Sequence, residues 1–197
     1  NDGSLTFHFT SDVSINNAGW DATISCISVP ACTGTPSPGT VTGTTTICAG
    51  SGTVLTATGA TVGLSGIQYQ WEESDDNGII DPWTSVMNGS GSTTAVFTAP
   101  ALSTSVYYRM NILCNNSLLS AASPGQLISI TPLPVVTVNA PITSICGTGT
   151  VSITANGGTS YSWSPAAGLN NTSAAIVQAS PASTTTYTVT GTSSGCS

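Results

Sequence analysis

The sequence has almost no positive charge: its 197 residues include one Arg, Arg109, and no Lys, against eight acidic residues. Binding the phosphates of a nucleic acid requires a cluster of cations, so this composition excludes a nucleic-acid groove. The formal net charge of −7 would also be repelled by anionic lipid headgroups. We therefore expect neither a nucleic-acid partner nor insertion into a membrane.

Long hydrophobic runs are also missing. The stretch 133–138 is among the longest, and a membrane-spanning helix needs about 20 apolar residues. No charged head and apolar stretch of a secretory signal follows Asn1, so we expect any export signal to have been removed or to lie upstream. With 39% apolar residues and four Trp, the chain nevertheless has enough material for a packed core.

The sequence is rich in hydroxyl side chains and contains several cysteines. There are 29 Ser and 33 Thr, and six cysteines accompany a single histidine, His8. An even number of cysteines with so few other metal ligands favours disulfides over a zinc site. Because disulfides persist in oxidising compartments, we expect an extracellular or cell-surface location.

The residue pattern predicts an all-β fold. Short β-branched or alternating stretches recur at 53–57, 67–71, 95–98, 106–113 and 187–190. Clusters of Gly, Asn, Pro and Ser between them supply tight turns. No stretch has a helical period with caps, and Lys, Glu and Gln are scarce.

An internal repeat gives the organisation of the chain. The stretch 48–57 returns at 146–155, and each copy continues into a Tyr-x-Trp and closes on a cysteine, Cys114 or Cys196. We expect two related β-sandwiches with Trp71 and Trp163 in their cores. The duplicated frame favours the disulfides Cys48–Cys114 and Cys146–Cys196, and leaves Cys26 and Cys32 to pair across a tight loop.

These motifs resemble the Ig-like and PKD-like repeats of large secreted surface proteins of Bacteroidota, such as gliding-type adhesins exported by the type IX route. The first copy carries the resemblance in Tyr69-Gln-Trp71, Ser74 to Gly78, Trp83, Phe97 to Pro100, Tyr107 to Arg109 and Cys114. The second copy carries it in Tyr161 to Pro165, Gly168-Leu169, Ser180-Pro181, Thr184 to Thr190 and Gly195-Cys196. The resemblance implies a non-catalytic structural or adhesive segment.

The first residues are similar to the last two strands of a CUB domain. The similarity lies in 5–10, 11–14 and 19–26. It implies tandem Ig-like sandwiches after a partial CUB-like sandwich, and it leaves open that Cys26 belongs to the rest of that unit. The expected organisation is a CUB-like end at 1–32, a Thr/Pro/Gly linker at 33–43, a first Ig-like domain at 44–132 and a second, incomplete one at 133–197.

Two places invite calcium. The CUB resemblance implies a ligand carboxylate at Asp12 and a ligand carbonyl at Ser14, although a polar turn between strands explains these residues better. The acidic stretch 72–81 is rich in oxygen atoms, but its Asn77-Gly78 pair favours a hairpin turn. We therefore expect no cofactor beyond this candidate calcium.

Catalytic chemistry is not expected. Glu72 and Glu73 are neighbours on a predicted strand and would point to opposite faces, so they cannot flank a sugar together. His8 alternates with Phe7 and Phe9, which is typical of a sheet face, and no nucleophile motif accompanies it.

Three functions fit these features. The leading one is a stalk, adhesin or filament component of a larger bacterial surface protein, whose partners would be other copies or domains of that protein, glycans or cell-surface proteins. The first alternative is a carbohydrate-binding appendage of a secreted hydrolase or peptidase, which predicts an exposed Trp83 or exposed Tyr residues lining a groove. The second is a self-assembling fibre subunit completed by strand exchange.

Overall fold

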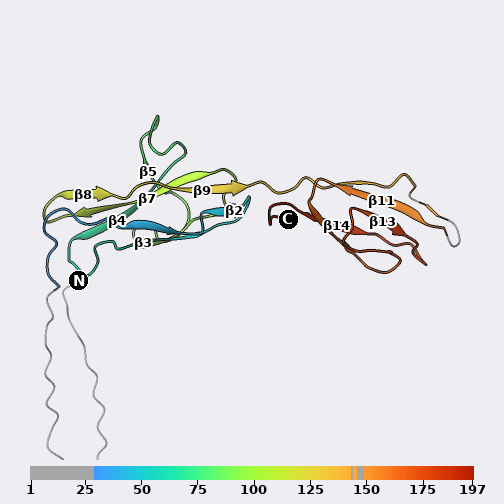
Figure 1. Cartoon of the computed structure of the whole chain (residues 1–197). Helices are drawn as coiled ribbons and strands as arrows, with labels where there is room; N and C mark the ends of the chain where they lie inside the picture. The colour runs from blue at the N-terminus through green and yellow to red at the C-terminus, as the bar shows by residue number, and fades with distance from the viewer. Residues whose placement is uncertain (1–28, 143, 146–148) are drawn as a thin grey trace, which may run out of the picture.

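A computed structural model describes residues 29–142, 144–145 and 149–197, and in these ranges the chain is all-β, as the sequence predicts. Its strands form two sandwiches that lie end to end (Figure 1). The described residues contain no helix of the length and hydropathy that a membrane crossing requires.

The first sandwich is built from nine strands. One sheet has the order β1-β3-β6, and the other has the order β2-β9-β7-β4-β5 with β8 also paired to β7. All pairings are antiparallel except that of β2 with β9, which is parallel. The strands are β1 (Thr40–Gly43), β2 (Thr46–Cys48), β3 (Val54–Thr58), β4 (Ile67–Ser74), β5 (Thr84–Ser85), β6 (Val96–Thr98), β7 (Val106–Cys114), β8 (Leu119–Ala122) and β9 (Gln126–Thr131).

Aromatic side chains fill the space between these two sheets. Trp71 and Phe97 are fully buried, with ring centroids 5.6 Å apart, and Tyr108 lies 5.3 Å from Phe97. The Trp71 indole N–H donates to the carbonyl of Thr94 at 2.8 Å, so burial leaves no polar atom of this ring unpaired.

The second sandwich repeats this plan with fewer strands. One sheet has the order β10-β11-β13, and the other consists of β12 and β14 alone. Trp163 is 4% exposed, and its indole N–H donates to the carbonyl of Ala174 at 2.9 Å, which matches the place of Trp71. The strands are β10 (Thr137–Asn139), β11 (Val151–Asn156), β12 (Ser160–Ser164), β13 (Ile176–Ala179) and β14 (Thr188–Thr192).

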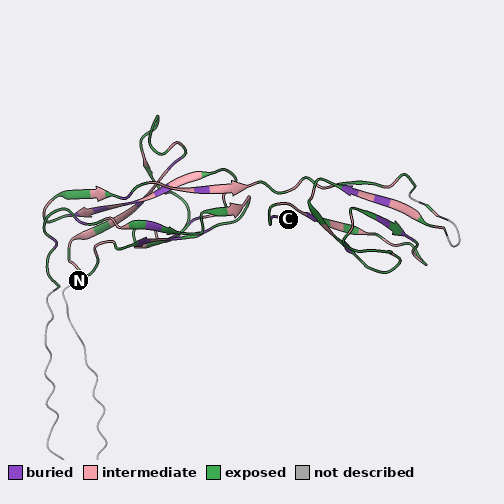
Figure 2. Cartoon of the chain, in the orientation of Figure 1, coloured by how far each residue is buried: buried purple, intermediate pink, exposed green. Residues whose placement is uncertain are grey.

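Each sandwich has its own core, and the buried residues lie between its sheets (Figure 2). The chain passes from β9 to β10 through residues 132–136, and after β14 it returns to the junction, where the C-terminus lies near β2 (Figure 1).

The disulfides differ from the expected pairs. Cys32 is bonded to Cys114, and Cys48 is bonded to Cys196. The expected Cys48–Cys114 and Cys146–Cys196 bridges and the alternative Cys26–Cys32 bridge are therefore wrong. Cys26 and Cys146 themselves lie outside the described residues.

Strand directions explain why Cys48 does not reach Cys114. Cys48 lies opposite Thr131 at the end of β9, and β9 runs antiparallel to β7 with Ile128 opposite Val106. Cys48 thus lies beyond the first residue of β7, whereas Cys114 is the last residue of that nine-residue strand. The strand spans about 30 Å, and disulfides need Cα atoms within about 7 Å.

The segment before β1 belongs to the first sandwich. The N–H of Cys32 donates to the carbonyl of Ser65 at 3.0 Å, and the N–H of Ser65 donates to the carbonyl of Pro30 at 2.9 Å. The range expected as a linker, 33–43, contains β1, whose Val41 is buried in the core. Residues 40–43 of this range therefore belong to a sheet of the first sandwich.

Candidate functional site

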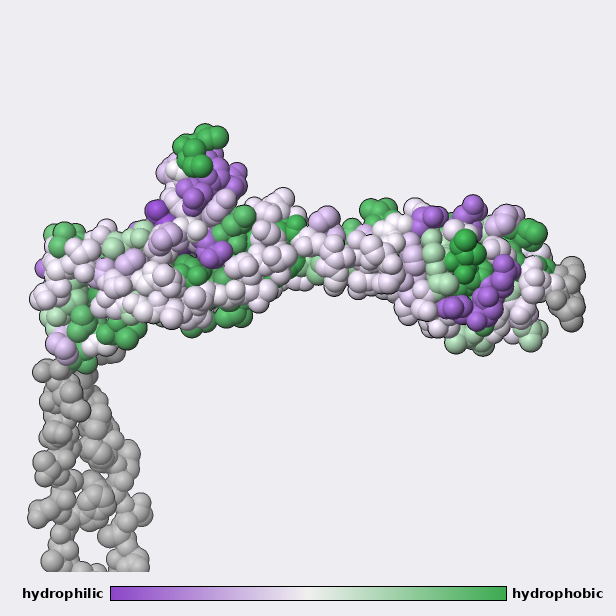
Figure 3. Space-filling model, in the orientation of Figure 1, coloured by the Kyte–Doolittle hydropathy of each residue, from purple (hydrophilic) through white to green (hydrophobic). Residues whose placement is uncertain are grey.

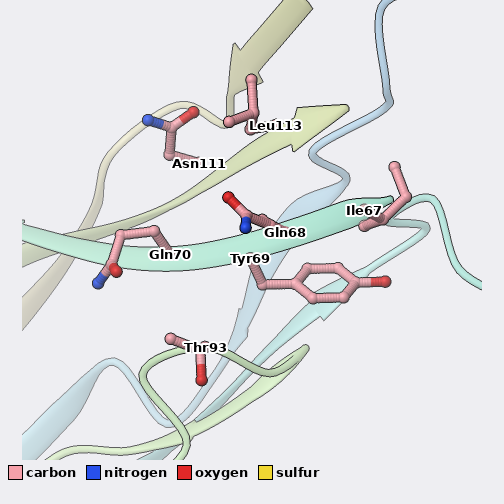
Figure 4. Close-up of a pocket in the computed structure, with 7 residues that line it drawn as sticks. All are labelled: Ile67, Gln68, Tyr69, Gln70, Thr93, Asn111 and Leu113. Atoms are coloured by element: carbon pink, nitrogen blue, oxygen red, sulfur yellow. The ribbon is translucent and has the colours of Figure 1, made fainter. Parts of the chain in front are cut away.

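A hollow of about 490 Å³ lies along β4, on the side of β7 (Figure 4). The amides of Gln68, Gln70 and Asn111 line it, together with Tyr69 and Thr93. These residues come from opposite faces of β4, because side chains alternate along a strand. The hollow is thus a shallow surface feature that wraps the strand.

Three of the side chains that line this hollow bond to other groups of the chain. The Tyr69 hydroxyl donates to the carbonyl of Thr61 at 2.6 Å, and burial raises its pKa. The Gln70 amide donates to the carbonyl of Trp71 at 2.8 Å, and that of Asn111 donates to Glu72 at 2.9 Å. The hollow offers hydrogen bonds to a ligand but neither a nucleophile nor a general base.

A charged cluster continues the same face of the sheet. Arg109 Nε donates to Glu72 Oε2 at 2.6 Å, and the guanidinium lies 4.4 Å from the centre of the Trp83 ring. Glu72 also accepts from Asn111, so its carboxylate is bound on both oxygens. Arg109 is therefore held between a carboxylate and an aromatic face.

Two glycines allow Trp83 to lie flat on this face. A Cβ on Gly78, which has a φ of 72°, would lie 2.4 Å from the indole nitrogen, and one on Gly125 would lie 2.8 Å from the ring. Trp83 is half-buried and packs on the sheet, with one ring face against Arg109. Trp83 is therefore not a fully exposed platform, which the carbohydrate-binding alternative offers as one possibility beside exposed Tyr residues.

The acidic stretch forms a turn organised by Asp76. Its carboxylate accepts the backbone N–H groups of residues 78–81 and the hydroxyl of Ser74 at 2.9 Å. These hydrogen bonds, that of Ile80 first, lower the pKa of Asp76 to about 2. Both oxygens of the Asp76 carboxylate accept backbone N–H groups. Asp76 therefore stabilises the conformation of the turn. Sequence reasoning identified the turn but missed this role of Asp76.

The turn projects from the sandwich between β4 and β5 (Figure 1). Ile79 and Ile80 in it are 81% and 85% exposed, and the space-filling view shows a hydrophobic cap above hydrophilic residues at the top of the projection (Figure 3).

In residues 29–142, 144–145 and 149–197, no three His, Cys, Asp or Glu side chains gather as a metal site. Glu72 bonds to Arg109, whereas Glu73 lies beside Tyr108 on the other face of the sheet. The candidate calcium ligands Asp12 and Ser14, and His8, fall outside the described residues.

The junction between the two sandwiches is held by a turn on each side and by a disulfide. A turn through Ser194 and Gly195, with φ angles of 52° and 82°, presents Cys196, and Ser193 and Cys196 exchange two backbone hydrogen bonds of 2.9 Å. On the other side, the N–H of Ala49 donates to the carbonyl of Thr131 at 2.9 Å. The Cys48–Cys196 disulfide joins these two turns across the junction.

Comparisons with known proteins match a family model and solved structures. Residues 37–132 match the family model described as a domain of unknown function, DUF8696. A search of curated protein sequences finds no match. Among solved structures, the chain is similar to the three N-terminal domains of the Highly Immunogenic Outer Capsid protein (Hoc) of bacteriophage RB49, with 19% identity and a TM-score of 0.37. That alignment covers 76% of this chain, and this chain spans about half of that one, 52%.

Proposed function

We propose that this chain is a non-catalytic extracellular spacer, a segment of a bacterial surface stalk, adhesin or filament that holds its neighbours at a fixed separation. The observation that carries the proposal is the Cys48–Cys196 disulfide, which links one sandwich to the other. A bond placed between two folded units adds little to either core, and it restricts how the units move relative to each other.

Two covalent connections therefore cross the junction. The first is the chain itself at residues 132–136, where Pro132 and Pro134 restrict the backbone. The second is the disulfide, which leaves the junction without a free hinge. Disulfides of this kind are typical of proteins that mature in oxidising, extracytoplasmic surroundings.

The described surface suits this role. The hollow along β4 is shallow, and Arg109 is already bound to Glu72 and stacked on Trp83. Such a surface supports contact with other domains or copies of the same protein better than it supports chemistry on a substrate. Trp83, one of the rings on which the carbohydrate-binding alternative relies, is half-buried against Arg109, and this favours the spacer over that alternative.

Single-particle electron microscopy of the protein tests the proposal. The wild type should show one narrow distribution of the angle between the sandwiches, and the double variant Cys48→Ser/Cys196→Ser should show a distribution at least twice as wide. The double variant Cys32→Ser/Cys114→Ser is the matched control, because it removes a disulfide inside the first sandwich and should leave the angle narrow. Equal widths in the wild type and the junction variant would refute the spacer.

A further inference from the structure

Two isoleucines lie in the turn that projects between β4 and β5. Ile79 and Ile80 are 81% and 85% exposed, and the end of the projection is hydrophobic in Figure 3. Neither side chain packs against the core of the first sandwich. Single exposed apolar residues are normal on a protein surface, whereas apolar groups gathered inside a polar rim mark interaction sites. Packing within the sandwich therefore does not explain this pair.

The turn holds the pair in one conformation. The N–H groups of Ile79 and Ile80 both donate to the carboxylate of Asp76, so their backbone is fixed by its own hydrogen bonds. At the base of the turn, the N–H of Gly78 donates to the hydroxyl of Ser74 at 2.8 Å. A binding group whose conformation is already formed loses less entropy on association. The tip is therefore a preorganised apolar anchor.

Acidic side chains form the rim of this anchor. Asp75 and Asp81, on either side of the isoleucines in the sequence, are both exposed. The one ion pair within residues 29–142, 144–145 and 149–197 joins Arg109 to Glu72, so no cation neutralises these two carboxylates. An apolar tip with an acidic rim is complementary to an apolar pocket with a cationic rim.

The composition of the chain argues against a second copy as the owner of such a pocket. The sequence contains no Lys, and its single Arg, Arg109, is bound to Glu72 and stacked on Trp83. A second copy would therefore bring no free Lys or Arg to the acidic rim. An anionic lipid surface would repel the same carboxylates. A different protein is the occupant that these charges favour.

We propose that this turn inserts Ile79 and Ile80 into an apolar pocket of a different protein, whose rim carries Lys or Arg. Burial of the two side chains supplies affinity and slows dissociation, whereas attraction between the charged rims speeds association. The turn belongs to the first sandwich alone, so the inference does not depend on the spacer function.

Site-specific cross-linking of the whole 197-residue protein identifies the partner. A photoreactive amino acid is placed at position 79, and the protein is mixed with surface extract of the cells that produce it. The matched control carries the same group at position 118, where Leu118 is 79% exposed in the turn between β7 and β8. We expect one protein adduct to be at least tenfold more abundant from position 79.

Binding kinetics with the purified partner then separate the anchor from its rim. Ile79→Ser/Ile80→Ser should raise the dissociation rate at least tenfold, whereas Met87→Ser, which alters an equally exposed apolar residue outside the turn, should stay within twofold of the wild type. Asp75→Asn/Asp81→Asn should lower the association rate at least threefold at low salt and reduce its salt dependence. Circular dichroism should show all three variants folded, because every altered side chain is exposed.

The same measurements can overturn the proposal. Equal adduct yields from positions 79 and 118 would do so, as would an adduct made of two copies of this chain. Binding to phosphatidylcholine vesicles that Ile79→Ser/Ile80→Ser abolishes would assign the tip to a lipid surface instead. A partner that binds the isoleucine variant as tightly as the wild type would exclude the pocket, and an association rate unchanged by Asp75→Asn/Asp81→Asn would exclude its cationic rim.

Discussion

At the scale of single residues, Asp76 controls the conformation of the turn after β4, because four backbone N–H groups point to its carboxylate. We expect Asp76→Ala to increase hydrogen exchange at the amides of residues 78–81 at least tenfold, while the fold of the first sandwich is kept. Mass-spectrometric exchange on the purified variant measures this. Unchanged protection would mean that the turn is held by packing instead.

The same carboxylate gives an acid dependence of known direction. Its pKa is lowered to about 2 in the folded protein, below the ordinary value near 3.8. The charged form therefore stabilises the turn above about pH 4, and this contribution is lost as the pH falls through 2. Exchange at residues 78–81 should rise over this window, and Asp76→Ala should remove the pH dependence.

Tyr108 gives the opposite dependence at high pH. Burial, followed by the charge of Glu73 and a hydrogen bond to it, raises the pKa of its hydroxyl to about 12 from an ordinary value of 10. The neutral hydroxyl is favoured in the fold, so its contribution is complete below pH 10 and is lost as the pH rises through 12. The stability of Tyr108→Phe, measured by urea unfolding from pH 9 to 12, should fall less steeply than that of the wild type.

At the scale of elements, the Cys32–Cys114 disulfide fastens the segment before β1 to the end of β7. It closes a loop with a sequence separation of 82 residues, which corresponds to about 4 kcal/mol in the chain-entropy model. Cys32→Ser/Cys114→Ser should lower the free energy of unfolding of the first sandwich by roughly this amount, as denaturant titration of Trp71 fluorescence can measure. A loss below about 1 kcal/mol would show that the segment contributes little.

The elements themselves could be read from the sequence because their signals are local. Alternating side chains placed the central strands, and the two Tyr-x-Trp motifs placed the indoles that the structure buries in the two cores. The disulfide partners could not be read, because pairing depends on which ends of two strands meet. The parallel contact of β2 with β9 decides this, and it joins residues more than 80 positions apart.

The candidate site could be predicted from the sequence only in part, because it also depends on contacts between segments that are distant in the sequence. The Asn77-Gly78 turn carries its own signal, but the covering of Trp83 by Arg109 needs β4, β7 and the turn together.

At the scale of the whole molecule, the two disulfides change the route that mechanical tension takes through the chain. A force that enters before Cys32 and leaves after Cys196 can pass from Cys32 to Cys48 and cross directly to Cys196. This route holds 16 residues and extends to about 55 Å. The residues between Cys48 and Cys196, which include the entire second sandwich, form a loop closed by the disulfide. The force does not act along this loop and does not unfold it.

Optical tweezers with handles at the two ends can measure this. In Cys48→Ser/Cys196→Ser the shortest route runs through Cys114 and on to residue 196, about 66 residues longer, so the fully stretched length should grow by about 230 Å. A stalk cross-linked in this way would extend by only a short distance under shear and would keep its second sandwich folded.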